Sequence, residues 1–193
     1  MALANGDPAS DVLIAERVFY PYEVKLPAES TRALRETIAS AKEQGFPVRV
    51  ALIAHDYDLG SAALVYRKPQ FYSKFLAQEL AQFTRDWVLI VMPNGYGIYR
   101  CVPQRRPGGY SDPCEGGRPT AADERLLASL APPERSGEDY AAAAELAVRR
   151  LAERHGASFG PGPAPWVAGG AVLLGAASVL FRRRRTARAP APR

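Results

Sequence analysis

The apolar residues of this chain follow two patterns, continuous runs and helical spacing. The runs at residues 48–54 and 87–92 predict strands that are covered on both faces. Apolar residues three or four positions apart, with charged residues between them, predict helices over residues 27–44 and 69–83. A strand, a helix and a strand in this order form a βαβ unit, so we expect parallel strands and a right-handed crossover.

Shorter elements complete the predicted domain. Residues 12–19 are rich in apolar and β-branched residues and predict a further strand. A turn at Pro93, Asn94 and Gly95 leads back into a strand over residues 96–102. Helices are expected over residues 121–130 and 139–154. The pattern indicates one α/β domain, a small mixed sheet of about three to four strands flanked by helices.

The C-terminal part has a different pattern. Residues 156–165 are rich in Pro and Gly and predict a stiff linker. The segment from Trp166 to Phe181 is uncharged and apolar on every side, which predicts a transmembrane helix. At 1.5 Å a residue it is about 24 Å long, short for a hydrocarbon core of about 30 Å, and a thinned bilayer would accommodate it. The run ends at four basic residues: Arg182, Arg183, Arg184 and Arg185.

Charge gives the expected orientation. Basic residues beside a span stay in the cytoplasm, so residues 182–193 are predicted to be a cytoplasmic tail and the domain at residues 11–155 to lie outside the membrane. Export of that domain requires a signal peptide. Ala2, Leu3 and Ala4 resemble a signal-peptide cleavage site, so residues 1–10 are interpreted as an N-terminal remnant of a longer leader. The alternative, a tail-anchored protein facing the cytoplasm, would have to translocate six arginines.

The net charge of +5 suggests a nucleic-acid-binding protein until its distribution is considered. The tail from Arg182 holds six of the 25 basic residues and no acidic one, which leaves 19 basic against 20 acidic residues elsewhere. A nearly neutral domain lacks the excess of positive charge that phosphate binding needs. Nucleic acid is therefore not an expected partner, whereas the lipid bilayer and a protein of the cell envelope are.

The chain has two cysteines, Cys101 and Cys114, which enclose a loop rich in Pro and Gly. In an exported domain they are expected to form a disulfide, and in a cytosolic one they would be free thiols. Two thiols without a nearby His do not complete a metal site.

Polar residues follow both central strands, where ligands of open α/β sheets bind. Asp56 and Asp58 come after the first strand and Asn94 after the second. Their oxygen atoms could bind Ca²⁺ or another divalent cation. The alternative is a solvated loop in which Asp58 caps the next helix. His55 lies beside them without a recognisable nucleophile, and no motif for a cofactor is present.

The segments KEQGFPVRVALIA, YSKFLAQEL and DWVLIVMPNGYGIY resemble the TPM domain, over about residues 11–151. The segments GDPASDVL and VFYPY also resemble a group of actinobacterial membrane proteins of unassigned function. The resemblance implies an exported α/β domain with a signal peptide at one end and a single span at the other. Phosphatase activity and divalent-cation binding are attributed to some members of the family. Asp11 is the position that matches an early Asp of the family, so it joins the candidate metal ligands.

The sequence thus predicts a single-pass membrane protein that displays a non-catalytic TPM-like domain outside the membrane, as an interaction or chaperone-like module. The alternative is a membrane-tethered, divalent-cation-dependent hydrolase of phosphatase type.

Overall fold

The protein contains a four-stranded mixed sheet in the order β1-β2-β3-β4. In this computed structural model, the described residues are 7–102, 114, 117–136 and 139–160. The strands are β1 (Val18–Phe19), β2 (Val48–Leu52), β3 (Trp87–Met92) and β4 (Gly95–Tyr99). The first three are parallel, and β4 pairs with β3 in the antiparallel direction. The predicted α/β class with a small mixed sheet is confirmed.

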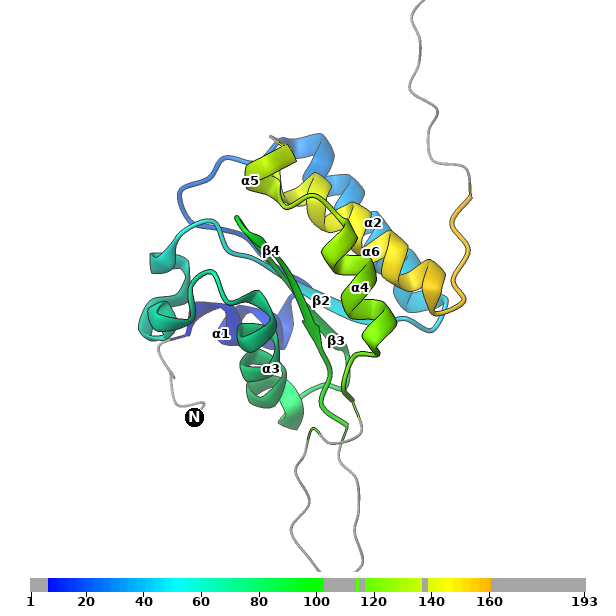
Figure 1. Cartoon of the computed structure of the whole chain (residues 1–193), viewed down its shortest axis with the longest axis horizontal. Helices are drawn as coiled ribbons and strands as arrows, with labels where there is room; N and C mark the ends of the chain where they lie inside the picture. Colours follow the sequence, from blue (N-terminus) through cyan, green and yellow to red (C-terminus); the bar gives the residue numbers. More distant parts are fainter. Residues whose placement is uncertain (1–6, 103–113, 115–116, 137–138, 161–193) are drawn as a thin grey trace, which may run out of the picture. The chain divides into compact units, whose positions relative to one another are not determined.

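Helices cover both faces of the sheet (Figure 1). One face carries α1 (Pro8–Ala15) and α3 (Pro69–Glu79), and the other carries α2 (Ala28–Glu43), α4 (Ala121–Ser129) and α6 (Tyr140–Arg154). Successive strand residues point to opposite faces, so two apolar clusters form, one on each side of the sheet. The shorter helical pieces are η1 (Asp56–Val65), η2 (Leu80–Gln82) and α5 (Pro133–Ser136).

The N-terminal element differs from the prediction. Residues 12–19 were expected to form one strand, but the chain is helical in α1 until Ala15, and only Val18 and Phe19 pair in the sheet. The helix begins earlier because the Asp7 side chain accepts a hydrogen bond from the Ala9 N–H at 3.2 Å and Pro8 occupies the first turn. Asp7 is buried, so residues 7–10, assigned above to an N-terminal remnant, belong to the folded domain.

The two parallel connections have opposite handedness. The chain steps from β1 to β2 and from β2 to β3 in the same direction across the sheet. The first connection runs through α2 on one face, and the second runs through η1 and α3 with α3 on the other face. Two steps in one direction with helices on opposite faces must differ in hand. One of them therefore departs from the usual right-handed crossover. The parallel pairing predicted for the strands at residues 48–54 and 87–92 is confirmed, and the right-handed crossover between them stays a prediction.

The described residues belong to one compact unit, which ends at Gly160. In the described part of the chain, no helix has the length and apolar character needed to cross a membrane. The predicted span from Trp166 to Phe181 and the four arginines after it lie outside the described residues.

Candidate functional site

Asp58, one of the predicted metal ligands, is a buried structural acceptor. Its side chain is fully inaccessible to solvent. One carboxylate oxygen accepts the Tyr22 N–H at 3.0 Å, and the other accepts the N–H groups of Ala54 and His55, each at 2.9 Å. Backbone N–H groups stabilise a buried carboxylate and compensate for the loss of its hydration. Asp58 thus joins the segment after β1 to the segment after β2.

The other three predicted metal ligands come from three different segments. Asp56 is exposed at the start of η1, and Asp11 is exposed on α1. Asn94, in the turn between β3 and β4, donates to the Arg67 carbonyl at 2.8 Å. Within the described residues, no three His, Cys, Asp or Glu side chains are grouped so that they could hold a metal ion. A metal site at Asp11, Asp56, Asp58 and Asn94 stays a prediction from the sequence pattern.

The strand ends also carry His55, which is exposed and stacks on Tyr57 with ring centroids 5.0 Å apart. The Tyr57 hydroxyl donates to Glu23 at 2.9 Å. These contacts fix an aromatic surface beside Asp58. A base that activates a nucleophile lies at hydrogen-bonding distance from it. Among the described residues, the hydrogen bonds of His55 are made by its backbone N–H and carbonyl groups.

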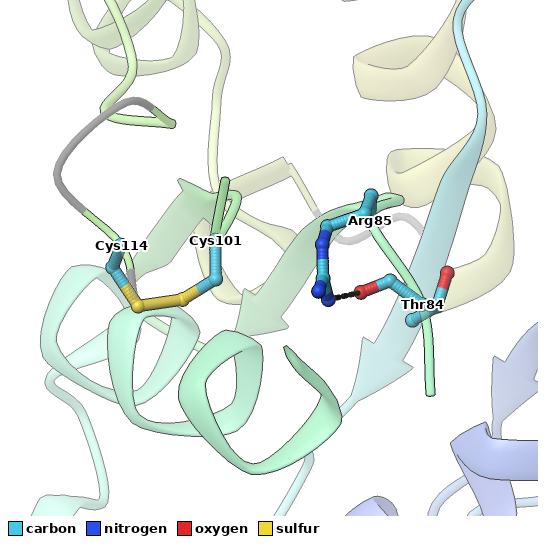
Figure 2. Close-up of a disulfide and its surroundings, with 4 residues drawn as sticks. All are labelled: Thr84, Arg85, Cys101 and Cys114. Atoms are coloured by element: carbon cyan, nitrogen blue, oxygen red, sulfur yellow. Dashed lines mark hydrogen bonds between the residues drawn. A yellow bond between two sulfur atoms is a disulfide. The ribbon is translucent and has the colours of Figure 1, made fainter. Parts of the chain in front are cut away.

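Cys101 and Cys114 form a disulfide, as predicted (Figure 2). Cys101 follows β4, and both residues are buried in the apolar cluster that lies between the sheet and α3. The bond closes a loop with a sequence separation of 13 residues. Disulfides persist in oxidising compartments, so this bond is consistent with a domain outside the cytoplasm.

A groove of about 680 Å³ lies beside the edge strand β4. It is bounded by the first residues of α3, by the start of β4 and its preceding turn, and by α4 with the segment that follows it. The lining residues are Pro69, Gln70, Asn94, Gly95, Tyr96, Glu124, Leu127, Ala128, Ser129, Leu130, Ala131 and Pro132. The sequence does not predict this groove, because its residues come from three distant segments with no shared motif.

Close packing and hydrogen bonds hold the groove open. The Gln70 side chain donates to the Ile98 carbonyl at 3.0 Å and accepts the Ile98 N–H at 3.1 Å, which fixes α3 against the edge of β4. On the other wall, the Tyr96 hydroxyl donates to the Ala131 carbonyl at 2.8 Å. Both walls are therefore tied to β4, and the groove is a preformed feature of the fold.

The charge of the groove is negative. Glu124 is the one side chain in its lining that is charged at neutral pH, and within the described part of the chain its carboxylate forms no ion pair. The C-terminal end of α4 also faces the groove, and no basic residue lies in the last turn of that helix. A helix C-terminus carries about half a negative charge on its unpaired carbonyls. The groove therefore combines apolar walls with one carboxylate that has no ion-pair partner among the described residues.

Comparisons with protein-family models, with curated proteins and with solved structures found no match for this chain. The resemblance to the TPM domain accordingly stays a prediction.

Proposed function

We propose that this protein is a single-pass membrane protein that displays a non-catalytic, TPM-like α/β domain outside the membrane and binds an envelope protein there. The observation that carries the proposal is the preformed groove beside β4. Its volume lies in the range of about 300–1,000 Å³ that is usual for binding pockets. Its apolar walls are available for a partner.

Two further features support this function. The buried disulfide suits an oxidising environment, as expected for an exported domain. At the strand ends, the Asp58 carboxylate accepts three backbone N–H groups and the His55 ring stacks on Tyr57. These residues organise loops. Binding is therefore favoured over the hydrolase alternative.

The test uses the full chain in intact cells. A photo-crosslinking amino acid replaces Ala128, which is exposed in the groove, or Ala39, which is exposed on α2 and does not line the groove. We expect the position 128 variant to form a discrete adduct with another protein and the position 39 variant to form none. External protease is expected to digest both adduct and domain.

Two results would count against the proposal. A domain that survives external protease on intact cells, yet is digested after lysis, would contradict the topology. Adducts of equal yield from positions 128 and 39 would contradict the groove as the binding site.

A further inference from the structure

The residues that line the groove beside β4 indicate which kind of partner it would bind. Most of its lining is apolar or lacks a side-chain charge: Pro69, Gly95, Tyr96, Leu127, Ala128, Leu130, Ala131 and Pro132. Such walls bind apolar side chains by removing them from water. Glu124 adds one full negative charge at the wall formed by α4.

The opposite wall does not cancel this charge. It is the first turn of α3, whose helix dipole contributes about half a positive charge. Pro69 occupies the first turn and has no N–H, so this end of the helix has one donor fewer to offer. The half charge of α3 is opposed by the half charge at the end of α4. Glu124 lies in the first turn of α4, where the dipole of its own helix stabilises the carboxylate, and its full charge is the one net side-chain charge in the lining.

We infer that the groove binds an extended segment of a partner protein in which apolar residues flank a Lys or Arg that pairs with Glu124. This inference rests on the proposed function and adds the chemistry of the partner. Extended peptides dock in preformed grooves by placing side chains in apolar recesses, while one charged contact sets the register. A bidentate Arg–carboxylate pair in such a site is directional as well as strong.

The experiment selects binders from a random peptide display library with the full chain held in lipid nanodiscs. Five proteins are compared: wild type, Glu124→Gln, Ala128→Trp, Ser129→Trp and Ala121→Trp. Ala128→Trp fills the groove, whereas Ala121→Trp makes the same change at an exposed position of α4 outside the lining. Ser129→Trp serves as a second groove-filling variant, and circular dichroism establishes that each variant is folded.

We expect wild type and Ala121→Trp to select the same apolar peptides with a Lys or Arg. Binding of those peptides should be lost in Ala128→Trp and Ser129→Trp. In Glu124→Gln it should weaken by about tenfold or more, the factor that corresponds to loss of a hydrogen bond between charged groups. The Gln variant should also no longer select a basic residue.

The failures are distinguishable. If the selected peptides lose binding in the groove-filling variants but are not enriched in Lys or Arg, the pairing with Glu124 is wrong and the proposed function still holds. Selection that is unchanged by both groove-filling variants would overturn the groove itself, and with it the proposed function. If free arginine at equal concentration displaces the peptides, the ligand of the groove is a small cation and not a peptide. Self-association that Ala128→Trp abolishes, without peptide selection, would assign the groove to a second copy of the chain.

Discussion

Asp7 and Tyr72 form a buried polar pair that ties α1 to α3. The Tyr72 hydroxyl donates to one carboxylate oxygen of Asp7 at 2.7 Å, and the other oxygen has no hydrogen-bond partner among the residues that the structure describes. Burial raises the pKa of Asp7 above its usual value of 3.8, although the bond from Tyr72 acts in the opposite direction. A carboxyl group with a raised pKa in the folded state contributes stability below pH 3.8. That contribution is lost as the pH rises through the folded-state pKa.

Tyr72→Phe is expected to reduce the free energy of unfolding by about 1–3 kcal/mol at pH 7, because it removes the hydroxyl donor from a buried, ionised carboxylate. The loss should be smaller near pH 4, where the carboxyl group of the folded protein is more protonated. Urea unfolding at both pH values measures the difference. Tyr22→Phe is the control, since Tyr22 is 62% exposed. An equal loss at the two pH values would contradict the role assigned to the charge.

Single residues were the least predictable level. The Cys101 and Cys114 pair was expected because two cysteines in an exported domain have one simple pairing. The alternative role of Asp58 as a cap agrees with its acceptance of the His55 N–H, but its burial and its bond to Tyr22 depend on the neighbouring β1 segment. Asp7 was overlooked, although an Asp before a Pro is a recognised start of a helix.

At the scale of elements, the contact between α3 and β4 depends on the absence of a side chain. A Cβ atom added to Gly97 would lie 2.1 Å from the Pro69 carbonyl oxygen. The first turn of α3 therefore rests directly on the backbone of the edge strand. The same contact places Pro69 and Gln70 at the wall of the groove.

Gly97→Ala is expected to lower the free energy of unfolding by about 1–3 kcal/mol, because the added methyl group must displace a helix backbone. Thermal and denaturant unfolding measure the change. Gly160→Ala is the matched control, since a Cβ there would have no atom within 4 Å. If both variants unfolded at the same denaturant concentration, the close contact would have no energetic importance.

Elements with a strong periodic pattern were predicted well. β3 has the predicted bounds Trp87–Met92, and α2 lies within residues 27–44 as expected. The misassigned segment was α1, because Val12, Leu13 and Ile14 are an apolar run too short to distinguish a strand from a buried helix. The hydrophobic pattern also does not predict the handedness of the connections, because handedness depends on which face of the sheet each helix covers.

At the scale of the whole molecule, the disulfide restrains a loop that begins at the end of the sheet. Its closure is expected to stabilise the folded domain by about 3 kcal/mol in the chain-entropy model. A reducing agent should therefore lower the unfolding midpoint of the wild type. The variant with both Cys101→Ala and Cys114→Ala should unfold near the reduced midpoint and show no response to the agent. A wild type indifferent to reduction would contradict this contribution.

The groove could not be predicted from the sequence, because it forms only when distant elements pack together. Pro69, Tyr96 and Leu130 have ordinary roles in their own segments, and only the packing of α3 and α4 on opposite sides of β4 brings them together. Composition and motifs describe what a segment contains. A site built from the ends of three elements is defined by tertiary structure.

The pairing of α2 with α6 has a consequence for the order in which the domain matures. Ser30 donates to Asp139 at 2.7 Å and Thr37 donates to Glu145 at 3.0 Å, across 109 and 108 positions of the chain. The apolar side of α2 therefore stays uncovered until α6, the last helix of the described domain, has been synthesised and packs on it. During synthesis, or during passage through a translocation channel from the N-terminus, all of the domain that precedes Tyr140 emerges before α6 can cover α2. A holding chaperone would find its target in the uncovered face of α2.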